Sequence, residues 1–87
     1  MTMDRHIIFG VHVLDRVKDA TIVQKLFTEY GCHIKTRIGL HEVDGKICAP
    51  GGVIILEMYG DENTCHELRD KLAQVDGIEV KEMIFGH

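Results

Sequence analysis

The hydrophobic residues of this chain change their spacing along the sequence, and the order of these changes constrains the fold more than any other feature. Residues 6–14 alternate and are rich in branched side chains, which predicts a strand with one buried face. Alternation returns in residues 34–41, 53–59 and 78–85. The residues of the first strand that we expect to face the core are Ile7, Phe9, Val11 and Val13.

Two segments between these strands have helical spacing. The first stripe consists of Ala20, Val23, Leu26, Phe27 and Tyr30, and the second of Cys65, Leu68, Leu72 and Val75. We expect Asp19 to be the N-cap of the first helix and Gly31 to end it in a left-handed conformation. Asn63, or Thr64 with Glu67 in a capping box, is expected to begin the second helix.

The order strand, helix, strand, strand, helix, strand predicts a fold of the α+β class. With right-handed crossovers it becomes a ferredoxin-like βαββαβ sandwich, whose antiparallel sheet has the order 4-1-3-2 and carries both helices on one face. Residues 42–51 contain Asp44-Gly45 and Pro50-Gly51 and are predicted to form a long hairpin connection. In the last strand, Ile78 and Val80 differ in phase from Met83 and Phe85, which we interpret as a bulge near residues 81–82.

Length and composition fit one small globular domain. The chain has 87 residues, 45% hydrophobic and 28% charged, which excludes a disordered chain. We therefore expect a single domain over residues 1–87 with a core of about 5–85. No apolar run reaches the ~18 residues that a bilayer requires, and no signal peptide is visible at the N-terminus. The three cysteines, an odd number, favour free thiols in a reducing cytoplasm.

The charge pattern argues against direct nucleic-acid binding. The net charge is −4, and the ten Lys and Arg residues are scattered without a basic run. Nucleic-acid binders usually concentrate positive charge on one face. We therefore expect no direct contact with nucleic acid and none with a membrane.

The predicted fold leaves one face of the sheet without helices. The apolar residues placed there by the strand phases are Ile8, Val53, Ile55 and Tyr59. The polar residues placed among them are His6, His12, Lys35, Arg37, His41 and Glu57. Because an apolar patch on so small a domain commonly marks an interface, we expect a homodimer or tetramer. The alternative is a solvated sheet with isolated apolar residues.

Two segments are candidates for ligand binding. The turn Leu14, Asp15, Arg16, Val17 leads from a strand into a helix, where backbone amides can hold a small anion; a simple connection is the alternative. Arg37 is a further candidate, and with Lys35 and Glu57 it forms either ordinary cross-strand ion pairs or an anion site. The chain carries no recognisable catalytic motif, so we expect no enzyme activity and no cofactor.

Metal binding is the alternative function. Six histidines and three cysteines are many for this length, and sulfur and imidazole suit zinc or nickel. The best cluster is His41 with Cys48, joined by either Glu42 or His12, although no pair has the spacing of a local metal motif. A sensor or carrier of a transition metal would use these residues. Otherwise the histidines are surface residues and Cys65 belongs to the core.

Residues 34–42, 48–57, 68–72 and 77–81 resemble the small iron-only hydrogenase system regulators. The resemblance spans nearly the whole chain, and its motifs are Arg-x-Gly at Arg37 and Gly-x-x-Val-Lys at Gly77. That family is assigned an ACT-like, ferredoxin-like fold related to the ligand-binding domain of the nickel-responsive repressor. The resemblance implies a regulatory or sensing domain that oligomerises and binds a small-molecule effector.

In ACT domains effectors lie between protomers near the first strand-to-helix turn, which the resemblance maps onto residues 14–17. That turn lacks the glycine of amino-acid-binding members. His41 and Cys48 have places broadly analogous to metal ligands of the nickel-responsive repressor, but the strand 53–59 has no histidine. Because the chain has no DNA-reading element, an effect on transcription would require a protein partner.

Overall fold

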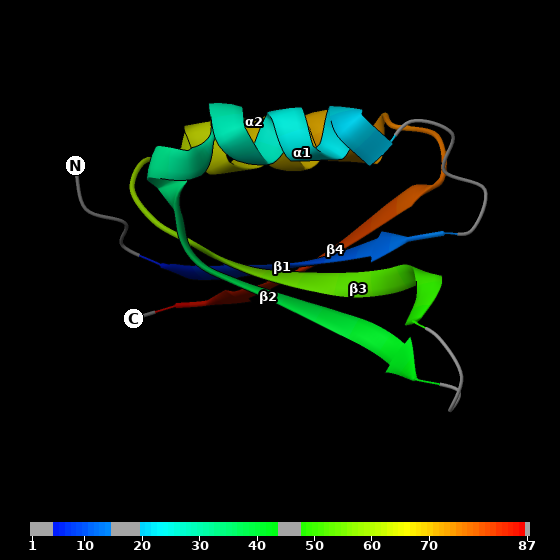
Figure 1. The fold of residues 1–87 in the computed structure, drawn as a ribbon. Helices are drawn as coiled ribbons and strands as arrows, with labels where there is room; N and C mark the ends of the chain where they lie inside the picture. The colour runs from blue at the N-terminus through cyan, green and yellow to red at the C-terminus, as the bar shows by residue number, and fades with distance from the viewer. Residues whose placement is uncertain (1–4, 15–19, 44–47, 87) are drawn as a thin grey trace.

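The computed structural model describes residues 5–14, 20–43 and 48–86, without the side chains of 20, 40–43 and 48–51. Its strands are β1 (His6–Val13), β2 (Ile34–Val43), β3 (Cys48–Met58) and β4 (Ile78–Phe85), and its helices are α1 (Ala20–Glu29), the 3₁₀ turn η1 (Gly31–His33) and α2 (Glu62–Ala73). Figure 1 shows two layers, a twisted sheet with α1 and α2 on the same face. The opposite face carries no helix among the described residues, and we call it the open face.

The sheet has the order β2-β3-β1-β4 with antiparallel neighbours. Read from the other edge, this is the order 4-1-3-2 that the sequence predicts. The ferredoxin-like α+β fold is therefore confirmed. Among the described residues, neither helix combines the length and the hydrophobicity needed to cross a membrane.

The core lies between the sheet and the two helices. Its buried side chains come from both layers and are Ile7, Phe9, Val11, Val23, Phe27, Tyr30, Leu56, Met58, Cys65, Leu68, Leu72 and Ile78. Both helical stripes and the core face of β1 are thus confirmed at the described side chains. Two-residue alternation in the strands and 3.6-residue spacing in the helices bring these side chains into one layer.

The ends of several elements differ from the sequence predictions. The helix α2 begins at Glu62, because the Asp61 carboxylate accepts hydrogen bonds from Thr64 N (3.1 Å) and Thr64 Oγ1 (2.9 Å) as the N-cap. Gly31 is not left-handed but begins η1, and the glycines with positive φ among the described residues are Gly60 and Gly77. The expected N-cap Asp19 lies outside the described residues.

The hairpin between β2 and β3 is shorter than expected, because both strands are longer. β2 continues to Val43 and β3 begins at Cys48. The pairing of β3 with β1 ends at Gly52, so the first residues of β3, including Pro50, extend past β1. Proline is tolerated there because that part of the strand is not flanked by partners on both sides.

The bulge expected in the last strand is absent. β4 pairs with β1 in one register from Ile78 opposite Val13 to Phe85 opposite His6. Ile78 and Val80 face the core, whereas Met83 and Phe85 face away from it by ordinary alternation. Register shifts occur instead in the pairing of β2 with β3, between Ile34 and Thr36 and between His41 and Val43.

Candidate functional site on the open face

Apolar side chains are concentrated on the open face. Four of the large hydrophobic residues that the structure exposes lie there, each about half exposed: Ile38, Tyr59, Met83 and Phe85. They extend across the sheet, because Ile38 pairs with Ile55 on β3 and Met83 pairs with Ile8 on β1. Directly opposed residues of antiparallel strands are in contact distance, and Ile8 and Ile55, which lie opposite Glu57 and Gly10, are diagonal neighbours within reach of each other. These residues therefore form one surface.

The four residues that the sequence placed at an interface are on this surface. Ile8 lies opposite Glu57, Ile55 opposite Gly10, and Val53 opposite His12. Their side chains are partly buried, while Tyr59 is 54% exposed. Gly10 leaves the middle of β1 bare, since a Cβ there would meet only the Lys81 carbonyl oxygen at 4.0 Å.

A polar cluster of Glu57, Thr36 and His6 lies at one end of the open face. The Glu57 carboxylate accepts a 2.8 Å hydrogen bond from Thr36 Oγ1 and lies 2.7 Å from His6 Nε2. These bonds, the one from Thr36 being the larger effect, hold the pKa of Glu57 below its ordinary value. The imidazole of His6 also contacts the Phe85 ring, with the ring centres 6.3 Å apart.

A looser pair of the same kind lies at the other end of β1. Nδ1 of His12 is 3.6 Å from Glu79 Oε1, and both side chains are about half exposed. On the open face, β1 therefore carries a histidine beside a carboxylate on each side of Gly10. The strand phases of the sequence predict His6, His12 and Glu57 on this face but do not reveal their partners Thr36 and Glu79.

Arg37 does not lie on the open face, contrary to the sequence prediction. It pairs with the buried Leu56, and its guanidinium lies 4.7 Å from the centre of the Phe27 ring of α1. Nη2 of Arg37 also donates a 3.1 Å hydrogen bond to Gln24 Oε1. The guanidinium is therefore held against α1 on the helix side and does not form the expected pair with Glu57.

The first strand-to-helix turn is described only at Leu14. Its backbone N–H donates a 2.8 Å hydrogen bond to the Gly77 carbonyl oxygen, so this amide is already used within the fold. Asp15, Arg16 and Val17 lie outside the described residues. The described parts of the candidate ligand site, Leu14 and Arg37, are thus held by different neighbours.

The metal candidates are described only in part. His12 faces the open side, whereas the side chains of His41 and Cys48 lie outside what the structure describes. Within the described part of the chain, no three His, Cys, Asp or Glu side chains are grouped closely enough to hold a metal ion. Cys32 and Cys65 are free thiols, and burial raises the pKa of Cys65.

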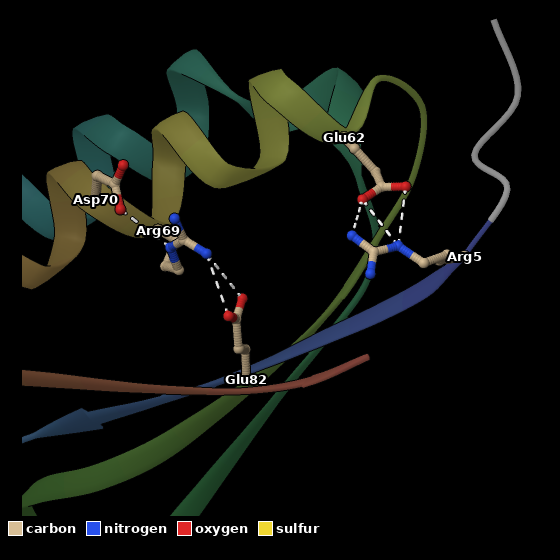
Figure 2. Close-up of polar contacts among 5 residues, drawn as sticks. All are labelled: Arg5, Glu62, Arg69, Asp70 and Glu82. Atoms are coloured by element: carbon tan, nitrogen blue, oxygen red, sulfur yellow. Dashed lines mark hydrogen bonds and ion pairs between the residues drawn. The ribbon is translucent and has the colours of Figure 1, made fainter. Parts of the chain in front are cut away.

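On the other side of the sheet, ion pairs connect α2 to β4 and to the residue before β1. Figure 2 shows Arg69 between Asp70 and Glu82, and Arg5 against Glu62. Hydrogen bonds from Arg5 lower the pKa of Glu62. These arginines are already paired with carboxylates, so this side offers structural links, and the open face is the candidate functional surface.

Comparisons with known proteins support the fold. An uncharacterized protein from Thermotoga maritima is similar in structure, with a TM-score of 0.76 and 28% identity over 92% of this chain and 95% of that chain. A formyltetrahydrofolate deformylase from Pseudomonas putida KT2440 is similar over 90% of this chain but only 28% of its own, with a TM-score of 0.50 and 10% identity. No family model matches this chain, and a search of curated proteins gives no match.

Proposed function

We propose that this chain is a small, non-enzymatic regulatory domain that associates with copies of itself through the open face and binds a small-molecule effector at a subunit interface. The observation that carries the proposal is the apolar surface that runs from Ile38 and Ile55 to Ile8 and Met83. Contiguous apolar surface of this kind commonly marks an interaction site.

The open face has the size that a specific dimer needs. Four strands about 4.8 Å apart and about eight residues long at ~3.3 Å per residue give a plan area of roughly 500 Å². Side chains make the accessible area larger than the plan area. Two facing copies would therefore bury on the order of 1,200 Å² or more in total, which is the lower end of specific interfaces.

The resemblance of residues 34–42 and 48–57 to the iron-only hydrogenase system regulators supports a regulatory role. We infer a function of that kind, in the cytoplasm, with any effect on transcription passing through a protein partner. The free thiols of Cys32 and Cys65 suit a reducing compartment. Association would act as the signal, because an effector that binds one arrangement better shifts its population.

The effector site that we propose lies at the first turn, with Leu14, Asp15, Arg16 and Val17, and includes Arg37. Its support is the position of effectors in ACT domains and the guanidinium of Arg37 beside α1. A small anionic molecule suits the arginine.

Sedimentation equilibrium tests the association. The wild type is expected to form dimers or tetramers, and Ile55→Glu is expected to dissociate them by placing a charge in the middle of the open face. Ile22→Glu is the matched control, because Ile22 is an exposed isoleucine on α1. A wild type that stays monomeric at millimolar concentration, or an Ile22→Glu variant that dissociates as Ile55→Glu does, contradicts the proposal.

A thermal-shift screen of small anions tests the effector. A molecule at 100 times its Kd stabilises the folded state by ~2.7 kcal/mol, and the shift should be lost in Arg37→Ala. Zinc and nickel belong in the same screen. A shift with either metal that Cys48→Ser abolishes would favour the alternative metal sensor.

A further inference from the structure

The pair His6–Glu57 lies at one end of the open face, next to its apolar side chains. Ile8 and Phe85 are its neighbours on β1 and β4, and Thr36 on β2 completes the contacts of the carboxylate. The side chains of His6 and Glu57 are 43% and 26% exposed. A second copy packed on the open face would therefore cover them.

The other charged or titratable groups of the open face are farther from the pair or less closely held. Lys35 on β2 acts on Glu57 through space. On β1 and β4, His12 with Glu79 and the neighbouring Lys81 lie toward the opposite end of the strands. Thr36 and His6 are therefore the main groups that stabilise the negative charge of the Glu57 carboxylate.

The free energy needed to bury the His6–Glu57 pair in an interface depends on the pH. Histidine ordinarily titrates at about pH 6.5, and glutamate is ionised well below that. With a neutral imidazole each copy brings the Glu57 carboxylate into the interface without a positive charge in contact with it, and burial of such a charge is unfavourable. With a protonated imidazole 2.7 Å away the pair is neutral overall. Burial therefore favours the protonated pair.

We infer that association of two open faces takes up a proton at His6 of each copy, so that the assembly tightens as the pH falls from 8 to 6. This inference rests on the proposed function, because it specifies how the same interface is regulated. The chain as a whole carries a net charge of −4 with neutral histidines, so protonation elsewhere also weakens repulsion between copies. The contribution of His6 must be separated from that general effect.

Sedimentation equilibrium of the full chain at pH 6, 7 and 8 and constant ionic strength tests the inference. The wild-type Kd is expected to fall on the order of tenfold from pH 8 to pH 6. His6→Gln is expected to remain at the weaker level, since a neutral amide cannot take up the proton. Glu57→Gln is expected to associate more tightly than wild type at pH 8 and no more tightly at pH 6.

Two controls accompany these variants. Glu79→Gln removes the other histidine-paired carboxylate of the open face and should keep most of the wild-type pH dependence. His12→Gln should do the same, because its contact with the carboxylate is longer. Circular dichroism melting of each variant at each pH verifies folding.

The outcomes distinguish the inference from the function on which it rests. A wild type that does not associate at any pH removes both. A wild type that associates equally at pH 6 and 8, or more tightly at pH 8, overturns the proton uptake and leaves the interface. Full pH dependence in His6→Gln, or its loss only in His12→Gln, overturns the assignment to His6.

Discussion

The guanidinium of Arg37 lies 4.7 Å from the centre of the Phe27 ring, so a charged residue of the edge strand β2 covers an aromatic residue of α1. A cation over an aromatic face is worth about 0.5–1 kcal/mol at exposed sites. The contact also fixes the Arg37 guanidinium beside the helix, together with its hydrogen bond to Gln24.

Replacement of Arg37 by alanine should therefore lower the free energy of unfolding by about 0.5–1 kcal/mol. Urea denaturation at pH 7 measures the change. Arg37→Lys keeps the charge but loses the planar group and its hydrogen bond to Gln24, so an intermediate loss is expected. An alanine variant as stable as wild type would show that the contact contributes nothing.

Leu68 is completely buried between α2 and the sheet. Leu68→Ala should cost about 2–5 kcal/mol, from the lost burial and the cavity left behind. Ile22→Ala on the exposed face of α1 is the comparison and should change stability by less than about 0.5 kcal/mol. Equal losses in the two variants would contradict the position of the core.

Gly60 follows β3 with φ of 94°, and a Cβ at this position would lie 2.9 Å from His33 Nδ1. Gly60→Ala should therefore be destabilising by more than about 1 kcal/mol. Gly31→Ala is the matched control, since Gly31 has no positive φ and open space around its Cα. Thermal unfolding of both variants checks the prediction, and a Gly60→Ala variant no less stable than Gly31→Ala would refute it.

Asp61 is the N-cap of α2, so protonation of its carboxylate at low pH weakens the start of this helix. Hydrogen bonds from the side chain and then the backbone of Thr64 hold its pKa below the ordinary value. Because the folded-state pKa is the lower one, the stabilisation is complete above about pH 4 and is lost as the pH falls through the folded-state pKa.

Asp61→Asn keeps a good N-cap without a titrating group, so its stability should resemble wild type at neutral pH and decline less steeply below pH 4. Asp61→Ala should lose about 4–8 °C in Tm at pH 7, as expected for a missing cap. The measurement is Tm against pH from 2 to 7. An asparagine variant with the acid profile of wild type would disprove the coupling.

Much of the fold follows from hydrophobic period alone. Ile7, Phe9 and Val11 alternate without interruption and are all buried, because a regular strand against helices leaves no other arrangement for such a pattern. The helical stripe through Val23 and Phe27 is equally regular. Long uninterrupted patterns of this kind determine both the element and its buried face.

The candidate site was predicted only in part, because one extra residue in β2 reverses which side chains of this strand face the core. A register shift between Ile34 and Thr36 places Ile34 on the core side but Thr36 and Ile38 on the open face. One extra residue reverses the facing of every residue after it. Arg37 was therefore assigned to the wrong face, and Thr36 and Ile38 were missed. Alternation read from the strand alone does not reveal such a shift.

The uninterrupted register of β4 has a consequence for solubility. Within the described sheet β4 pairs only with β1, so its outer backbone edge is a straight template for another extended chain. Glu79, Lys81 and Glu82 interrupt its hydrophobic residues, and charges at an edge oppose such pairing. Neutral residues in their place would favour fibrous aggregates, so these three charges protect the chain against edge-to-edge aggregation.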